Sequence, residues 1–264
     1  MIESNQEFIR TAIRVGNSAG VLLPKEWLNA TVKVVLQPLN IEKDIIQILM
    51  EEGLLKNVLG VYIVGSYARA EQTIDSDVDA LVITLNTNKR IKMGKYDILL
   101  ISRESMEKQL KTNALPLLPM IIESKPIINP DFLESYKKSA ITKKNLKWHL
   151  ETTKSAMNLV KKDIEVSEEM NGESGDATAY SLILRLRSLY LIESIKNNKR
   201  WSKEKFLDLI MKISGSLKAY ERYASAKNKN TLSYKLPADE AEKLMNYINK
   251  KTEEIERWLD EKKD

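Results

Sequence analysis

The sequence contains no cysteine and a single histidine, His149, among its 264 residues. Without cysteine the chain forms neither disulfides nor thiolate metal sites, and it has no thiol nucleophile. One histidine excludes a multi-histidine metal site and makes a Ser-His-Asp hydrolase a poor candidate. The polar chemistry of this protein must therefore rest on carboxylates, hydroxyls, lysine and arginine.

Long hydrophobic runs are also missing. No apolar stretch reaches the roughly 18 residues that crossing a bilayer requires, and residues 1–10 do not resemble a signal peptide. Hydrophobic residues nevertheless make up 43% of the chain, which is enough for packed cores and excludes disorder along the whole length. These features predict a cytoplasmic protein with no membrane partner.

The chain carries a small excess of positive charge, +5 at pH 7, which permits a polyanionic partner without requiring one. Residues 1–40 carry about +1, residues 41–130 about −1 and residues 131–264 about +5. Acidic residues thus gather in the middle of the chain and basic residues in its last part. This distribution suits a protein that binds cations in one place and phosphates nearby.

The hydrophobic pattern changes twice along the chain, which predicts three domains. Residues 1–40 alternate short β-branched runs with turn residues. Residues 41–130 combine helical stripes with buried strands, and residues 131–264 consist of helical patterns alone. The expected fold is therefore α+β, with a small N-terminal β-hairpin element, a central mixed-sheet domain and a C-terminal bundle of about five helices.

The first domain is expected to depend on a partner. Its pattern predicts strands over residues 8–15, 21–24 and 31–36 and a helical turn over residues 25–28. About forty residues with so few large apolar side chains make a poor independent core. We therefore expect this segment to pack against its own copy in a dimer or against the next domain.

A short motif gives this segment a family resemblance. The run Arg14-Val15-Gly16-Asn17-Ser18, followed by Val21-Leu22-Leu23-Pro24-Lys25, resembles the AbrB/MazE-like swapped-hairpin family over residues 8–36. In that family two chains interlock their hairpins and present basic strands and loops to DNA. The resemblance implies a homodimer, and it leaves open whether the element only dimerises or also binds DNA through basic residues such as Arg10.

The central domain is expected to contain three buried strands, over residues 58–64, 78–84 and 95–101. A helix should precede them, beginning at Ile41 and ending at Gly53. A second helix, capped by Ser102, is expected through Lys111. Residues 117–128 should add strand material interrupted by two prolines.

Three residues of the helical domain carry separate expectations. Arg185 and Arg187 lie in its most apolar helix, where two interpretations stay open. They could pair with acidic residues of neighbouring helices, or one of them could reach a bound triphosphate. His149 is expected on a helix surface rather than as a catalytic base.

The run from Val64 to Val82 contains the residue types of an anion site. A strand that ends at Gly65 allows the backbone to approach a ligand closely. Ser66 then begins a short helical turn whose free N–H groups favour phosphate. Arg69 follows one turn later and is expected to reach the same phosphate.

Three aspartates are expected to gather beside that anion site. Asp77 and Asp79 are two residues apart in a strand, so both side chains project from one face. Adjacent carboxylates repel each other unless a cation lies between them, and hard divalent ions such as Mg²⁺ prefer oxygen ligands. Asp97 lies in another apolar strand, and it becomes the third ligand if the two strands are neighbours.

A phosphate site beside metal-binding carboxylates indicates nucleotidyl transfer. A nucleoside triphosphate, by default ATP, would bind with its phosphates at Ser66 and Arg69. Two Mg²⁺ ions would then position an acceptor hydroxyl for in-line attack on the α-phosphate, with release of pyrophosphate. The acceptor stays open among a protein hydroxyl, a small molecule such as an aminoglycoside and an RNA end.

These residues also resemble a family signature. Gly65-Ser66, Arg69, Glu71, Ser76-Asp77-Val78-Asp79 and Asp97 are similar to the pattern of the DNA polymerase β-like nucleotidyltransferase superfamily, in its minimal and antibiotic-modifying branches. The resemblance spans residues 41–129.

The resemblance implies that Asp77, Asp79 and Asp97 hold the metal ions and that Asp97 accepts the proton of the attacking hydroxyl. It also implies that Gly65, Ser66 and Arg69 bind the triphosphate. Glu71 matches the pattern too, and its role stays open, with a simple pairing to Arg69 as one interpretation. The alternative from a different class is a DNA-binding regulator or antitoxin that uses this fold as a nucleotide sensor or scaffold.

Overall fold

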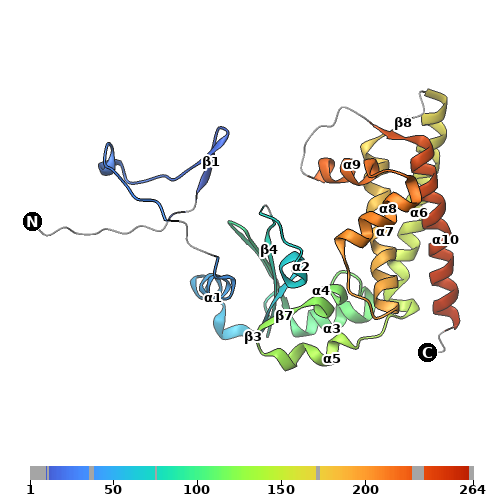
Figure 1. The fold of residues 1–264 in the computed structure, drawn as a ribbon. Coiled ribbons are helices and arrows are strands. Elements are labelled where there is room, and N and C mark those ends of the chain that lie inside the picture. Colours follow the sequence, from blue (N-terminus) through green and yellow to red (C-terminus); the bar gives the residue numbers. More distant parts are fainter. Residues whose placement is uncertain are drawn as a thin grey trace, which may run out of the picture.

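The computed structural model describes residues 10, 12–35, 39–74, 76–170, 173–227 and 235–261. A five-stranded mixed sheet lies between an N-terminal arm and a group of long helices (Figure 1). This is the α+β class that the sequence predicts. Among the described residues, no helix combines the length and the apolar character needed to cross a membrane.

The sheet brings the predicted central strands side by side. Its strands follow the order β5-β6-β4-β3-β7, and only β4 and β6 run parallel. The strands are β3 (Val58–Val64), β4 (Val78–Thr84), β5 (Lys89–Met93), β6 (Tyr96–Ser102) and β7 (Lys125–Ile128). The strands expected over residues 58–64, 78–84 and 95–101 are thus confirmed, the last one shifted by one residue.

Both faces of the sheet are covered, because its central strands are apolar at almost every position. Val78, Ala80 and Val82 of β4 pack in one hydrophobic cluster with α1 (Ile41–Glu51). Leu81 and Ile83 point to the opposite face. There they join a second cluster with α3 (Arg103–Thr112) and α4 (Leu118–Glu123). The helices expected from Ile41 and Ser102 are therefore confirmed.

The second hydrophobic cluster continues into the C-terminal helices. These helices are α6 (Lys143–Met170), α7 (Asp176–Lys196), α8 (Lys203–Ser214), α9 (Lys218–Lys227) and α10 (Ala238–Glu261). Among the described residues these five helices agree with the expected bundle of about five, and Figure 1 shows α6, α7 and α10 lying side by side. Shorter elements complete the chain: η2 (Leu55–Asn57), α2 (Gly65–Arg69), η3 (Pro130–Leu133), α5 (Glu134–Lys137), β8 (Glu173–Ser174) and β9 (Leu236–Pro237).

Two parts of the sheet domain differ from the sequence prediction. Residues 118–123 form α4 rather than a strand, because Pro119 stands in the first turn of that helix, where a missing N–H costs nothing. Only residues 125–128 form a strand. The strand β5 was not expected, since four of its five residues are exposed and three are basic.

The N-terminal arm, which we define as the described residues from 10 to 35, is a small hairpin with a long extension. Strand β1 (Ile13–Val15) pairs with β2 (Ser18–Gly20), and η1 (Lys25–Trp27) is the expected helical turn. The strands predicted at residues 21–24 and 31–36 are wrong for the described residues 21–24 and 31–35, and residue 36 lies outside them. Within the described part of the chain, no strand pairs with those residues.

Candidate active site

The turn between β3 and α2 requires glycine. Gly65 has a φ of +69°, in the left-handed region that other residues adopt only with strain. A Cβ atom built on Gly65 would lie 2.4 Å from Oδ2 of Asp79. The absence of a side chain therefore lets an acidic side chain of β4 lie directly against this turn, in which Ser66 is the next residue.

The sheet register places two of the predicted acids side by side. Asp79 of β4 is paired with Asp97 of the parallel strand β6, and on its other side with Val64, the last residue of β3. Paired residues of adjacent strands point to the same face, so the two carboxylates share one face beside the Gly65 turn. Asp77 lies one residue before β4 begins and is exposed.

Neighbouring carboxylates act on the acidic side chain of Asp79. Burial raises the pKa of Asp79, and the neighbouring carboxylates of Asp97 and Asp77 raise it further. A bound cation would remove this repulsion, and carboxylate oxygens are the donors that Mg²⁺ prefers. The donor set therefore fits a hard divalent ion, although within the described ranges no three carboxylates converge in the geometry of a ready metal site.

Two basic residues of β5, which sequence reasoning missed, hold the carboxylate of Asp97. Nε of Arg90 lies 2.6 Å from Oδ1 and Nη2 lies 2.8 Å from Oδ2, while Nζ of Lys92 is 3.3 Å from Oδ2. The hydrogen bond from Arg90 lowers the pKa of Asp97, with help from Lys92. Strands β5 and β6 form a hairpin around a turn at Gly94. That glycine, standing directly before an apolar strand, is the sequence signal that could have revealed the hairpin.

Arg69 is bonded to two carboxylates of the chain. Its Nε donates to Glu71 at 2.9 Å, the pairing that the sequence suggested, and its Nη1 donates to Glu123 at 2.6 Å. The backbone N–H of Gly65 also donates to Glu123, at 2.8 Å. The predicted phosphate donors Gly65 and Arg69 are therefore both bonded to a carboxylate of the chain.

Glu123 is the second group that sequence reasoning missed. It is the last residue of α4, and 10% of its side chain is exposed. Its burial beside Arg69 depends on the sheet and helix arrangement, since more than fifty residues separate the two in the sequence. No local pattern around Glu123 could have linked it to the Gly65 turn.

The three residues singled out in the helical domain have separate surroundings. Arg187 lies over the ring of Trp201, at 5.2 Å from the ring centre. Arg185 donates to Thr152. His149 is buried rather than on the surface as expected, because the stripe of buried residues on α6 includes this position, and its Nε2 bonds Asn113.

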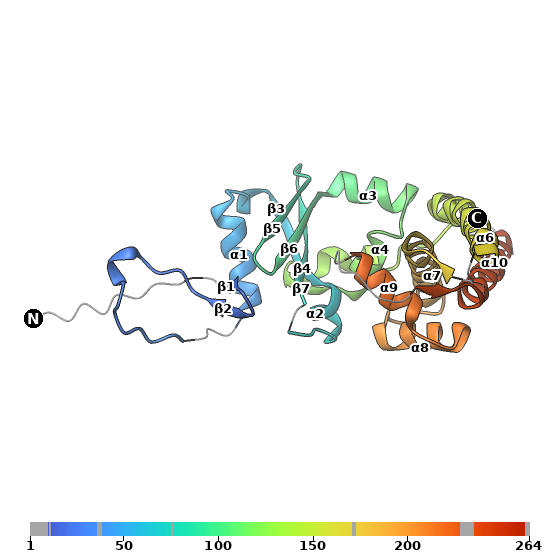
Figure 2. The same cartoon turned by 90° about the horizontal axis from the view of Figure 1, so that it is seen from above.

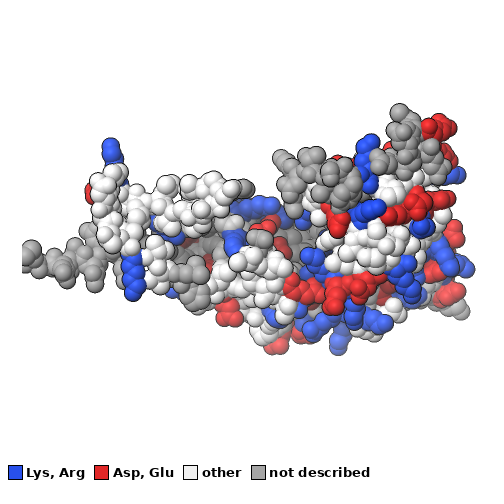
Figure 3. Space-filling view, turned by 45° about the horizontal axis from the view of Figure 1, so that its top comes forward, with Lys and Arg blue, Asp and Glu red and all other residues white. Residues whose placement is uncertain are grey.

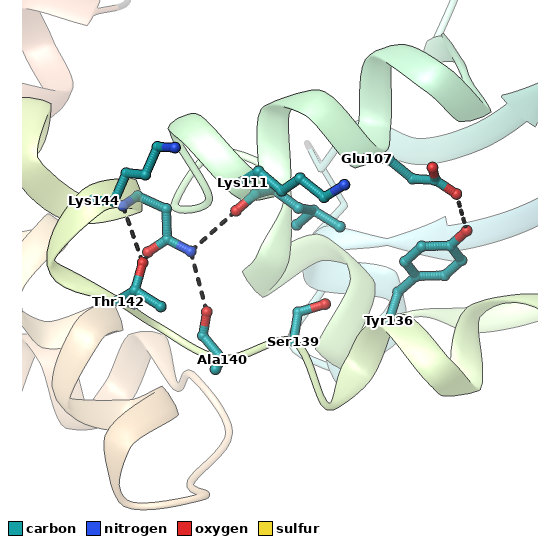
Figure 4. A pocket seen from close by; sticks show the side chains of 9 residues that line it. Glu107, Lys111, Tyr136, Ser139, Ala140, Thr142 and Lys144 are labelled. Carbon is teal, nitrogen blue, oxygen red and sulfur yellow. Dashed lines mark hydrogen bonds between the residues drawn. The ribbon is translucent and has the colours of Figure 1, made fainter. Parts of the chain in front are cut away.

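A cavity of about 470 Å³ lies away from the acidic residues (Figure 4). Its lining comes from α3, α5, the loop after α5 and the start of α6, and it includes Glu107, Lys111, Tyr136, Ser139, Thr142 and Lys144. Since α3 follows the C-terminal end of β6 and Asp97 stands near the N-terminal end, the cavity and the acids belong to opposite ends of that strand. We therefore keep the cavity apart from the candidate site.

The chain is similar to solved structures of other proteins. It resembles the solved structure of a nucleotidyltransferase-like protein from Exiguobacterium sibiricum 255-15, with 17% identity and a TM-score of 0.33 over 81% of this chain and 75% of that chain. It also resembles spectinomycin adenyltransferase AAD(9) from Enterococcus faecialis, solved with ATP and spectinomycin, with 14% identity and a TM-score of 0.42 over 80% of this chain and 98% of that chain. No curated protein matches the sequence.

A family model extends over a much longer stretch than the motif does. The model of the nucleotidyltransferase domain matches residues 42–212, from the first helix of the sheet domain into α8. The match includes the Gly65 turn and all three aspartates. Because it covers well over half of the sequence, the chain belongs to the nucleotidyltransferase domain family.

Proposed function

We propose that this protein transfers a nucleoside monophosphate, AMP from ATP, to an acceptor hydroxyl and releases pyrophosphate. The observation that carries the proposal is the pairing of Asp79 with Asp97 across two parallel strands, beside the turn at Gly65. The family match makes transfer of a nucleotidyl group the general activity. The choice of ATP, the metal ions and the residue roles are our proposal.

The three aspartates and the Gly65 turn would have different roles in this reaction. Asp77, Asp79 and Asp97 would hold two Mg²⁺ ions, while the turn at Gly65 and Ser66 would approach the phosphates of the nucleotide. When bound, the ions supply Lewis-acid stabilisation of charge on the attacking and leaving oxygens. Together these groups bring an acceptor hydroxyl and the α-phosphate into line.

The transfer step balances without a further reactant. The acceptor oxygen forms a bond to the α-phosphorus, the bond from that phosphorus to the bridging oxygen breaks, and pyrophosphate leaves with the electron pair. The hydroxyl proton passes to the carboxylate of Asp97. Arg90 and Lys92 keep this carboxylate ionised but weaken it as a base, so proton transfer requires the Arg90 contact to loosen.

Labelled nucleotides test the reaction directly. The purified chain is incubated with Mg²⁺, one α-labelled nucleoside triphosphate at a time and a cell lysate, RNA or small-molecule acceptors. We expect label from ATP on one acceptor class, and Asp77→Asn and Asp79→Asn should abolish the transfer. Asp131→Asn, the same change on an exposed acid of η3, is the matched control. Undiminished transfer by Asp79→Asn would overturn the assignment.

We also propose that the N-terminal arm makes the protein a homodimer. None of its described side chains is buried, and several large apolar ones are strongly exposed, including Leu28 at 71% and Val34 at 74%. The arm is mostly uncharged in Figure 3, which favours contact with a second copy of the same arm over contact with nucleic acid. Deleting residues 1–39 should convert a dimer into a monomer in light scattering after gel filtration.

The alternative function is DNA binding through residues 8–36. Arg10 and Lys25 are exposed on the arm, whereas residues 8 and 9 and the side chain of Arg14 lie outside the described part. A DNA-binding regulator would bind an operator with a steep salt dependence that survives Asp77→Asn. DNA affinity that persists after deletion of residues 1–39 would exclude this use of the arm.

A further inference from the structure

Arg69 joins two carboxylates that come from different elements. Glu71 lies in the loop after α2, and Glu123 ends α4. The guanidinium uses Nε for the first, at 2.9 Å, and Nη1 for the second, at 2.6 Å. Only 15% of the arginine side chain is exposed, so both ion pairs are partly shielded from solvent.

Each of the two carboxylates has a second contact that leads further away. Glu123 accepts the backbone N–H of Gly65 at 2.8 Å, so it is bonded to the turn that precedes Ser66. Glu71 accepts the backbone N–H of Lys203, the first residue of α8, at 3.2 Å. A continuous series of hydrogen bonds therefore runs from the Gly65 turn to the start of a helix in the C-terminal bundle.

The far end of this series is attached to a well-packed part of the bundle. Ser202 caps α8 by accepting the N–H of Lys205, and Glu71 satisfies another N–H of the same first turn. Trp201, just before the cap, packs against Tyr190 of α7 and Phe206 of α8. Both views show α2 on the side of the sheet that faces these helices (Figures 1 and 2).

The chemistry of the guanidinium explains why arginine stands here. A planar fork donates to two carboxylates in different directions at once, whereas a lysine ammonium is a compact charge with no fixed geometry. Nε and Nη1 are bonded to Glu71 and Glu123, so these two of the five N–H donors serve contacts within the protein. The contacts of Arg69 fit a structural connection better than the phosphate-binding role that the sequence suggested.

We infer that Glu123, Arg69 and Glu71 form a bracket that fixes the Gly65 turn relative to α8, with Arg69 as a positioning residue. The bracket holds the proposed nucleotide-binding turn and the helical part of the protein in one relative position. The role of the bracket in catalysis rests on the proposed nucleotidyl transfer. The hydrogen-bonded connection between the Gly65 turn and α8 does not depend on that proposal.

Hydrogen exchange of the full chain without nucleotide tests the connection. In Arg69→Lys, which keeps the charge, exchange should accelerate roughly tenfold both at the Gly65 turn and at residues 203–205, since each loses part of a charge-assisted network. Glu123→Gln should also accelerate exchange at residues 203–205, although Glu123 does not bond to α8. Glu107→Gln removes the carboxylate of an exposed ion pair with Arg103 on α3 and should change neither segment.

Measurements of nucleotide binding distinguish a positioning role of Arg69 from direct phosphate binding by Arg69. Binding of ATP with Mg²⁺ is measured for Arg69→Lys, Glu71→Gln and the double variant. The bracket predicts that each single change weakens binding by a similar factor and that the double variant is little weaker, because both break the same connection.

A protein that binds no ATP would leave the exchange test intact while refuting the proposed function. The bracket itself is overturned if Arg69→Lys leaves exchange at residues 203–205 unchanged, or if the Arg69 and Glu71 effects on binding simply add. Arg69→Lys and the glutamine variants are mild changes, and circular dichroism of each confirms that the fold is retained.

Discussion

At the scale of single residues, the two paired aspartates have opposite electrostatic surroundings. Asp79 has its pKa raised by burial and by neighbouring carboxylates, whereas the Arg90 hydrogen bond lowers the pKa of Asp97. Carboxylates whose pKa values are driven apart can take different roles in one reaction. Asp79 therefore gains most from a neighbouring cation, and Asp97 already has cationic partners.

Arg90 gives a prediction about these roles. Asp97→Asn should lower the rate of label transfer at least a hundredfold, the usual range for loss of a general base or a metal-binding carboxylate. Arg90→Gln should leave the rate unchanged or raise it, because Arg90 weakens Asp97 as a base and 61% of the Arg90 side chain is exposed. Equal losses in the two variants would mean that Arg90 contacts the substrate itself.

His149 predicts how stability depends on pH. Burial and the nearby Arg185 lower its pKa from 6.5 to about 4. Between these values the unfolded chain binds a proton that the folded chain does not, so stability falls as the pH drops from 6.5 and the loss is complete below 4. The shift corresponds to about 3 kcal/mol. Urea unfolding at pH 7 and pH 4.5 should show a smaller loss for His149→Gln than for the unchanged chain, and equal losses would contradict this account.

At the scale of elements, the turn between β3 and α2 gives a sharp comparison between two glycines. Gly65 and Gly94 both have positive φ, but only at Gly65 would a Cβ meet a neighbour, Asp79. Gly94→Ala should cost about 1 kcal/mol of folding free energy from backbone strain alone. Gly65→Ala should cost more and also abolish transfer, since it pushes Asp79 away from the turn. Thermal unfolding and label transfer measure both effects, and equal behaviour of the two variants would be inconsistent with the close contact.

The elements also show what the sequence could predict. The strands β3, β4 and β6 follow from long apolar runs, because a strand buried on both faces needs them whatever its neighbours are. The positions of Asp77, Asp79 and Asp97 in the sequence predict the acidic residues of the site, and the strand register places Asp79 beside Asp97. The Gly94 turn was a local signal for the hairpin that carries Arg90. Glu123 could not be found in this way, since its contacts depend on which helix lies beside the Gly65 turn.

At the scale of the whole molecule, the sheet domain is tied to the helices that follow it. Asn145 of α6 donates to the carbonyl of Leu110 and accepts, through its own carbonyl, the N–H of Ala114, so it holds the end of α3. One hydrophobic cluster includes Leu81 of the sheet and Leu186 of α7. The predicted boundary at residue 130 therefore divides the sequence without dividing this core.

A fragment of residues 41–130 tests this dependence. Without α6 and α7 it would expose apolar surface of α3 and α4 that is buried in the full chain, so we expect it to bind a hydrophobic dye, to lack cooperative unfolding or to aggregate. Residues 41–264 should unfold cooperatively. A fragment 41–130 that unfolds in one sharp transition would show that the boundary separates independent domains.

The shared core has a consequence for how such an enzyme could change its acceptor. A helical part borrowed from another nucleotidyltransferase would meet a sheet face shaped for different side chains, and the mismatch would leave cavities or clashes beneath α3 and α4. New acceptor specificity is therefore more accessible through substitutions on the outer surfaces of the existing helices than through exchange of the helices as a module.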